Sequence, residues 1–177
     1  MPSIRTAHTA DLDPATLETA RSLLFDVFAG DFGDEDWEHG LGGVHAVAYE
    51  GAVLVGHASV VMRRLVHQGR ALRCGYVEAV GVHPDHQRRG IGTTLMTALK
   101  PYVVGGYDVG ALGASDVARP MYATLGWQPW RGRLSALTPD GLRPTPDEAG
   151  AVYVLPGAAA LDLDGELTCD WRDGDVW

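Results

Sequence analysis

A short polar segment combines arginines and glycines in a pattern that could bind a phosphate group. It separates a strand-like stretch from a stretch with helical periodicity. The first N–H groups of a helix have no carbonyl partner within that helix and carry partial positive charge. Glycines would let a phosphate approach those N–H groups, and arginine or hydroxyl side chains would add further donors. The candidate anion-binding residues are Gln87, Arg88, Arg89, Gly90, Gly92 and Thr93.

Other readings of this segment fit less well or remain open. A Walker A loop needs Gly-Lys followed by Ser or Thr, and no lysine is present here. A dinucleotide fingerprint needs a third glycine and a parallel βαβ unit, whereas the preceding stretches favour antiparallel hairpins. A solvent-exposed turn would have the same composition, because motifs this short often occur by chance.

A single carboxylate interrupts an otherwise apolar stretch just before this segment. Glu78 lies in the sequence GYVEAVGV, where a charged side chain is unexpected. A carboxylate in such a position could accept a proton from a reacting amine, directly or through water. A buried salt bridge would produce the same pattern, so both interpretations stand at this point.

The charged residues are distributed unevenly along the 177-residue chain, whose net charge is −9. Residues 1–62 contain two basic and ten acidic side chains, residues 63–133 contain ten basic and four acidic, and residues 134–177 contain two basic and nine acidic. A basic middle between acidic ends suits a protein that binds an anion centrally and a cation elsewhere, although solubility alone would explain it too. Nucleic acid is an unfavourable partner because the basic residues are scattered.

The composition is that of a globular protein, with 46% hydrophobic and 21% charged residues. No run is long enough for a membrane-spanning helix, and the first residues lack the apolar core of a secretory signal, so we expect a cytoplasmic protein with no membrane partner. Cys74 and Cys169 form no metal-binding pair, and His39, His45 and His57 show no ligand spacing. We therefore expect no metal.

The elements that must position these residues follow from periodicity and turn residues. We expect strands at 3–9, 44–50, 52–68, 71–82, 108–115, 127–137 and 151–156. We expect helices at 14–28, 93–103 and 118–125, and a short helix within the acidic stretch 30–40. The last twenty residues have no clear periodicity. This order predicts one domain over residues 1–177, of the α/β class (α+β type), with a mixed, mostly antiparallel sheet flanked by helices.

The phosphate-binding candidate also resembles a known family. Gln87-x-x-Gly90-x-Gly92, after a strand and before a helix, resembles the acetyl-CoA signature of the GCN5-related N-acetyltransferase (GNAT) superfamily, and Tyr122-x-x-x-Gly126-Trp127 resembles its second signature. The resemblance implies the GNAT fold with splayed central strands, acetyl-CoA as cosubstrate and a homodimer. It also implies that the segment from Gln87 to Thr93 holds the pyrophosphate, and that backbone groups of Val80 and Val82 bond the pantetheine arm.

Four longer segments narrow the resemblance to the aminoglycoside 2′-N-acetyltransferases. They are GDFGDEDWEHGLGGVHA, LRCGYVEAVGV, MYATLGWQPW and CDWRDGDVW, and they extend to the last residue. The implied substrate is an aminoglycoside or related polyamine sugar, acetylated on its 2′-amino group, which confers antibiotic resistance. The substrate-binding positions that the resemblance implies are Asp31, Asp36, Glu78, Ala79, Gly113, Glu148 and the α-carboxylate of Trp177. Ala79 and Gly113 replace a glycine and a serine of other members, and Glu148 replaces an aspartate.

Within this family, acetyl transfer needs a base, an oxyanion contact and an acid. We expect Glu78 to accept the amine proton, the N–H near Val80 to contact the oxyanion, and Tyr122 to protonate the departing thiolate. Three alternatives remain open: an acetyltransferase of an endogenous amino-sugar metabolite, a non-catalytic acyl-CoA-binding protein, and a nucleotide-binding regulatory domain that rests on the glycines alone.

Overall fold

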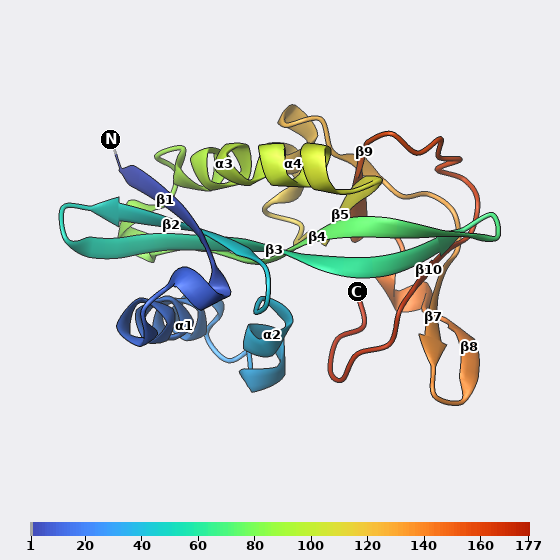
Figure 1. Cartoon of the computed structure of the whole chain (residues 1–177), viewed down its shortest axis with the longest axis horizontal. Coiled ribbons are helices and arrows are strands. Elements are labelled where there is room, and N and C mark those ends of the chain that lie inside the picture. The colour runs from blue at the N-terminus through green and yellow to red at the C-terminus, as the bar shows by residue number, and fades with distance from the viewer. Residues whose placement is uncertain (1) are drawn as a thin grey trace. The chain divides into compact units, whose positions relative to one another are not determined.

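The computed structural model describes residues 2–177 (Figure 1). These residues fall into two compact units. The first unit comprises the chain up to Val61 together with Val77–Tyr102, and the second comprises Met62–Tyr76 and Val103–Trp177. Strands β3 (Val53–His67) and β4 (Arg70–Val82) therefore each contribute one part to each unit. No helix among the described residues is both long and apolar enough to cross a membrane.

Antiparallel strands form the sheet of the first unit. Strand β2 pairs with β1 on one side and with β3 on the other, and a register shift at Ala48/Tyr49 marks an irregularity in the second pairing. Buried side chains of both β2 and the first part of β3 give this sheet its apolar interior. The remaining bounds are β1 (Ser3–His8), β2 (Val44–Glu50), α1 (Pro14–Phe28), α2 (Asp34–His39), α3 (Ile91–Gly106), and the 3-10 turns η1 (Thr9–Asp11) and η2 (Pro84–His86).

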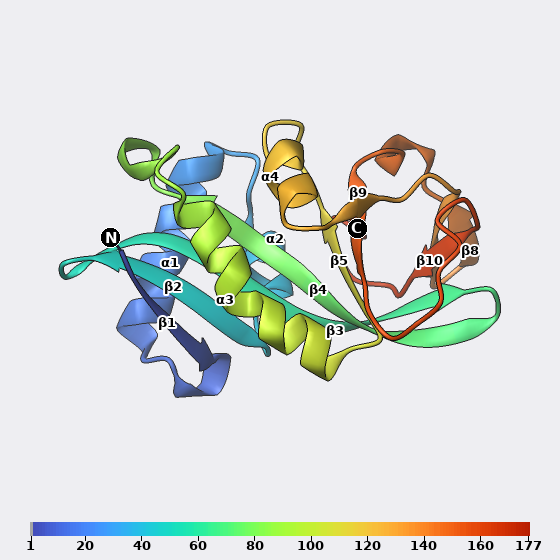
Figure 2. The same ribbon diagram turned by 90° about the horizontal axis from the view of Figure 1, so that it is seen from above.

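Helices cover both faces of this sheet (Figures 1 and 2). Helices α1 and α2 lie on one face and the first part of α3 lies on the other. Close contacts fix this packing: a Cβ added at Gly56 of β3 would lie 3.1 Å from Leu95 of α3, and one at Gly81 of β4 would lie 2.8 Å from Leu24 of α1. The helices therefore sit closer to the strands than a side chain at either position would permit.

Local sequence explains why α1 begins and ends where it does. The Asp13 carboxylate accepts the Thr16 N–H at 2.9 Å, and Pro14 occupies the first turn, where its missing N–H costs nothing. Ala29 ends the helix in the left-handed region, with φ 48°. The apolar stripe that includes Leu23 and Leu24 packs against the sheet.

The strands of the second unit form two groups, which the first part of β4 joins because β4 lies between β5 and β3 in the sheet order. In one, β9 (Val152–Pro156) pairs antiparallel with both β5 (Val109–Gly113) and β6 (Gln128–Pro129). In the other, β10 (Leu167–Cys169) pairs antiparallel with β3 and parallel with β7 (Leu134–Thr138), and β7 forms a hairpin with β8 (Gly141–Pro144). Helix α4 (Arg119–Thr124) and the 3-10 turn η3 (Pro146–Glu148) complete the unit.

The mixed, mostly antiparallel sheet with helices on its faces confirms the predicted fold class. The stretch expected to be a strand at 127–137 is interrupted, because Arg131 and Gly132 both donate to Leu163 O at 2.9 Å instead of continuing a ladder. Strands β8 and β10 were not expected, and α3 begins at Ile91, two residues before the predicted start. One domain over residues 1–177 stays a prediction.

Candidate active site

The loop between β4 and α3, residues 83–90, has the geometry of an anion site and is called the anion loop below. Its first intrahelical bond runs from the Thr94 N–H to Gly90 O at 3.0 Å. The N–H groups of Ile91, Gly92 and Thr93 therefore precede every bond of the helical ladder and face its N-terminal end. Since the positive end of the helix dipole coincides with them, an anion is favoured at this position.

Gly90 leaves the entrance to these N–H groups open. Its φ is 80°, in the left-handed region, and a Cβ added there would meet nothing within 4 Å. Arg88 is exposed, has φ 59°, and makes no ion pair among residues 2–177. A diphosphate fits this arrangement, because it needs a cradle without side chains and an uncommitted cation beside it.

Two other predicted anion-binding residues have partners that shape the loop. The Gln87 side-chain amide donates to Val82 O at 3.0 Å, so it spans the turn from β4 to η2. Arg89 forms an ion pair with Glu50 at 3.0 Å, and the same carboxylate lies 3.1 Å from Nδ1 of His86. Gln87 and Arg89 thus hold the loop in place, and Arg88 is the arginine whose charge is available to a ligand.

The strand that contains Glu78 is distorted one residue later. Ala79 has φ 52°, a left-handed conformation that residues with a Cβ rarely adopt. Its carbonyl accepts a hydrogen bond from His57 at 2.8 Å, and Ser59 Oγ lies 3.5 Å from Glu78 O. Glu78 and Val80 on either side are half-buried. The structure therefore places Glu78, Ala79 and Val80 at an irregular point of β4 rather than in a regular ladder.

The acidic helix α2 packs against this irregular point. A Cβ added at Gly40, which follows α2, would lie 3.6 Å from the Ala79 Cβ. Asp36 Oδ2 accepts the Gly33 N–H at 2.7 Å and so caps the helix with one of its two carboxylate oxygens. Asp31 is exposed in the preceding loop. The carboxylate of Asp36 is therefore fixed by a hydrogen bond at the start of α2, whereas Asp31 has no such hydrogen bond among the described residues.

In the second unit, Gly113 and Trp177 lie side by side. A Cβ added at Gly113 would be 3.8 Å from the Trp177 main-chain oxygen and 3.8 Å from Tyr76 Oη. The Trp177 side chain is buried, and its indole N–H donates to Thr145 Oγ1 at 2.8 Å. Arg172 donates to the Trp177 main-chain oxygen at 3.0 Å. These contacts fix a main-chain oxygen beside the end of β5.

Arg63 holds the C-terminal segment in place and was not singled out from the sequence. Its side chain is only 4% exposed and donates to the Asp170 carboxylate at 2.8 Å and to Val176 O at 2.8 Å. Its guanidinium also lies over the Tyr76 ring, 4.7 Å from the ring centre. One signal was available, because alternation in β3 places Arg63 on the same side as the buried Val61 and Leu65.

Glu148 is half-buried near other carboxylates, also within the second unit. Burial raises the pKa of its carboxyl above the ordinary value, and repulsion from Asp175 and Asp147 raises it further. The folded protein therefore holds the Glu148 proton to a higher pH than the unfolded chain does. A cation placed among these carboxylates would relieve the repulsion.

This raised pKa gives a prediction for stability. The proton on Glu148 favours the folded state at acidic pH, and that contribution is lost as the pH rises through the folded-state pKa. Glu148→Gln should therefore leave the free energy of unfolding unchanged near pH 4 and raise it at pH 7, by less than about 1 kcal/mol because solvent screens the site. Urea denaturation at both pH values measures this, and equal effects at the two would contradict it.

Tyr122 lies on α4 in the second unit, and its side chain is 4% exposed. Burial raises the pKa of its hydroxyl, so the phenol stays protonated near neutral pH and can act as a donor. Trp127 packs edge-on against its ring and donates its backbone N–H to Tyr122 O at 3.1 Å. Gly126, with φ 92°, permits the chain to turn back between them. The second sequence motif, Tyr122-x-x-x-Gly126-Trp127, thus forms the end of α4 and the turn that follows it.

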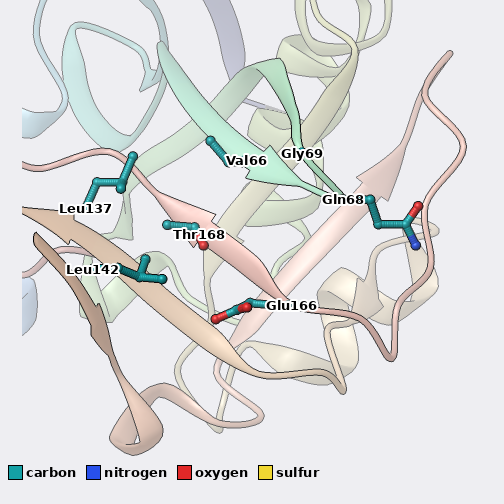
Figure 3. Close-up of a pocket in the computed structure, with 7 residues that line it drawn as sticks. All are labelled: Val66, Gln68, Gly69, Leu137, Leu142, Glu166 and Thr168. Carbon is teal, nitrogen blue, oxygen red and sulfur yellow. The ribbon is translucent and has the colours of Figure 1, made fainter.

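The residues 2–177 contain no group of three or more His, Cys, Asp or Glu side chains that could hold a metal ion. A separate pocket of about 380 Å³ lies in the second unit among β3, β7, β8 and β10 (Figure 3). It is lined by Val66, Gln68, Gly69, Leu137, Leu142, Glu166 and Thr168. None of the residues predicted from the sequence to be catalytic or to bind a ligand belongs to this lining.

Comparison with known proteins identifies related chains. Residues 10–127 match the acetyltransferase (GNAT) family. An aminoglycoside 2′-N-acetyltransferase from Mycolicibacterium fortuitum is 49% identical over 177 residues, covering 98% of this chain and 91% of the relative. A glucosamine 6-phosphate N-acetyltransferase from Schizosaccharomyces pombe is 39% identical over only 46 residues, 26% of this chain.

Solved structures share the fold. Eis1 from Mycobacterium abscessus superimposes with a TM-score of 0.61 at 26% identity, over 76% of this chain and 33% of that one. This chain thus spans about a third of the length of Eis1. A GNAT family N-acetyltransferase (YhbS) from Escherichia coli, solved in complex with CoA, has a TM-score of 0.63 at 17% identity, over 95% of this chain and 89% of that one. At that identity the likeness concerns the fold alone.

Proposed function

Because this chain belongs to the acetyltransferase (GNAT) family, we propose that it transfers the acetyl group of acetyl-CoA to the 2′-amino group of aminoglycosides. The observation that carries the proposal is the 49% identity to an aminoglycoside 2′-N-acetyltransferase over nearly the whole length of both chains. Acetylation removes a positive charge from the antibiotic, which gives the reaction its role in resistance.

Acetyl-CoA, when bound, supplies an acetyl thioester that an amine can attack. The N–H groups of Ile91, Gly92 and Thr93 bind the diphosphate, with Gly90 leaving room for it and Arg88 adding a charge-assisted contact. Gln87 and Arg89 keep the loop in this shape through Val82 and Glu50. Backbone groups of Val80 and Val82 bind the pantetheine arm, as the family resemblance implies.

The polycationic substrate needs carboxylates and backbone acceptors. Asp31, Asp36 and Glu148 supply carboxylates, and Ala79, Gly113 and Trp177 supply main-chain groups. Burial raises the pKa of Glu148 and repulsion from Asp175 and Asp147 raises it further, and a bound ammonium group offsets this repulsion. Glu78 accepts the proton of the attacking amine, and the Val80 N–H stabilises the oxyanion that forms on the thioester carbonyl.

Tyr122 protonates the departing thiolate in this mechanism, and its raised pKa keeps the phenol protonated before that step. Tyr122→Phe should therefore lower kcat by roughly a hundredfold, the low end of what a general acid contributes, while Kd for acetyl-CoA changes little. Stopped-flow thiol release and calorimetric titration measure the two quantities. A variant with wild-type turnover would remove Tyr122 from the mechanism and leave it as a packing partner of Trp127.

A matched pair of antibiotics tests the proposed function. Kanamycin B has a 2′-amino group and kanamycin A a 2′-hydroxyl, and the two molecules are otherwise the same. We expect CoA release with kanamycin B and almost none with kanamycin A, and NMR of the product should place the acetyl group on the 2′-nitrogen. Equal rates with both would contradict the assigned position. A higher kcat/KM with glucosamine 6-phosphate would favour an amino-sugar metabolite as the substrate.

The homodimer remains a prediction from the family resemblance, and the cytoplasmic location remains a prediction from the sequence composition. Light scattering on the purified protein tests the first, because a monomer and a dimer of this 177-residue chain differ twofold in mass. Fractionation of the producing cell tests the second.

A further inference from the structure

Two buried histidines join one edge of the first unit to the distorted point of β4. His45 and His57 are both 0% exposed, and His45 Nδ1 lies 2.8 Å from His57 Nε2. The chain of contacts continues at both ends. His45 Nε2 lies 2.7 Å from Thr9 Oγ1, and His57 Nδ1 lies 2.8 Å from Ala79 O. The mechanism above uses neither histidine.

The carbonyl at one end and the neutrality of both rings together fix the direction of the hydrogen bonds in this chain. A carbonyl only accepts, so His57 Nδ1 must hold a hydrogen and donate it to Ala79 O. Burial lowers the pKa of His57 to about 3 and that of His45 to about 4, so both rings are neutral near pH 7. His57 Nε2 therefore accepts from His45 Nδ1, and His45 Nε2 accepts from the Thr9 hydroxyl.

Packing leaves the two rings little freedom to turn. The Trp37 ring of α2 lies 5.8 Å from the His57 ring and 6.4 Å from the His45 ring. A Cβ added at Gly40 would come within 2.9 Å of Ser59 Oγ, so α2 ends close above the same part of the sheet. The donor at His57 Nδ1 is thus held at one position relative to β4.

His57 forms its hydrogen bond with the Ala79–Val80 peptide, and the N–H of this peptide is the predicted oxyanion donor. In a planar trans peptide the C=O and the following N–H point in opposite directions, and the described residues contain no cis bond. With Ala79 O directed at His57, the Val80 N–H must point away from it. Ala79 adopts φ 52°, a conformation that persists in a residue with a Cβ only when its surroundings enforce it.

We propose that His57, oriented by His45 and Thr9, is a positioning residue that holds the Ala79–Val80 peptide so that the Val80 N–H faces the thioester oxygen. The proposal rests on the proposed acetyl transfer, because it assigns a purpose to a backbone group of the same site. His57 touches neither substrate and acts only through the Ala79 carbonyl. Its loss should therefore lower kcat, whereas KM for acetyl-CoA should stay nearly unchanged.

Three replacements of His57 separate positioning from packing. His57→Leu fills the space without a donor, and we expect kcat to fall roughly tenfold to a hundredfold, somewhat less than the loss of an oxyanion donor itself. His57→Asn places an amide N–H near the Nδ1 position and should recover most of kcat. His57→Gln places its amide near the Nε2 position, toward His45, and should stay impaired.

His67 provides the matched control, because it is a buried histidine in the same kind of bond. It is 4% exposed, its Nδ1 lies 2.9 Å from Glu166 O, and its Nε2 accepts the Asp162 N–H at 3.1 Å. His67→Leu should cost similar stability and leave kcat within about twofold of wild type. All rates are measured with acetyl-CoA and kanamycin B well below each variant's Tm.

The outcomes distinguish the two proposals. An inactive wild-type protein would overturn the proposed function, whereas an active wild type with equal kcat in the His57→Asn and His57→Gln variants would overturn the positioning role alone. Equal reductions of kcat in His57→Leu and His67→Leu would also overturn the positioning role. Long-range ¹⁵N–¹H NMR of the wild type adds a direct readout: both His45 and His57 should be Nδ1-protonated tautomers, and an Nε2-protonated His57 would refute the proposal.

Discussion

Replacing Glu78 with glutamine should lower kcat by about 1,000-fold while the Kd for acetyl-CoA stays within about twofold of wild type. Glutamine keeps the size and polarity of the side chain but cannot accept a proton from the attacking ammonium group. The loss therefore falls on the chemical step and not on binding at the anion loop, which uses Arg88 and the first N–H groups of α3. Single-turnover acetylation and calorimetry measure the two effects separately.

The pH dependence of the same variant sharpens this expectation. Without Glu78 the enzyme must capture the small fraction of substrate whose amine has already lost its proton. As long as the pH is below the amine pKa, this fraction grows tenfold for each unit by which the pH rises. The kcat/KM of Glu78→Gln should thus rise steeply between pH 6 and 9, where the wild-type value levels off earlier. Glu18, an exposed carboxylate of α1, supplies the control, and Glu18→Gln should behave as wild type. Parallel pH profiles for Glu78→Gln and wild type would assign the proton to another group.

Features encoded within a few consecutive residues could be predicted from the sequence. Helix α1 has its cap, its proline and its apolar stripe all between Asp13 and Phe28, and the structure has it at the expected bounds. The anion loop is equally local, because strand, glycines and helix start follow one another directly. Such elements depend on short-range hydrogen bonds and periodicity, which a single sequence displays.

Features that depend on distant partners could not be predicted. Strand β10 has only three residues, too few for a period, and it exists because β3 and β7 bury it on both sides. The chemical type of Gln87 suggested an anion ligand, but its partner at Val82 depends on how the loop closes. The left-handed conformation of Ala79 could not be predicted either, because alanine, unlike glycine, does not favour it. His45 and His57 meet only through the pairing of β2 with β3.

The anion loop gives the other large effect, because Gly90→Asp should weaken acetyl-CoA binding at least about 100-fold. The new carboxylate would stand beside the bound diphosphate, and the residue would also have to adopt φ 80°, which disfavours any side chain. Gly90→Ala isolates the second contribution, and we expect about tenfold weaker binding from it. Since a Cβ at this position meets no protein atom within 4 Å, neither change should disturb packing in the free protein.

Gly105, near the end of α3, is the matched control for the charge. A Cβ there also meets nothing within 4 Å, so Gly105→Asp adds the same carboxylate to the same helix without crowding. Titration of CoA into each variant at low and high salt separates the effects. Raising the salt should recover part of the affinity lost in Gly90→Asp, because screening weakens the repulsion between the carboxylate and the diphosphate. Equal Kd values for Gly90→Asp and Gly105→Asp would mean that the diphosphate binds elsewhere, and the roles assigned to Arg88 and to the first N–H groups of α3 would be lost with it.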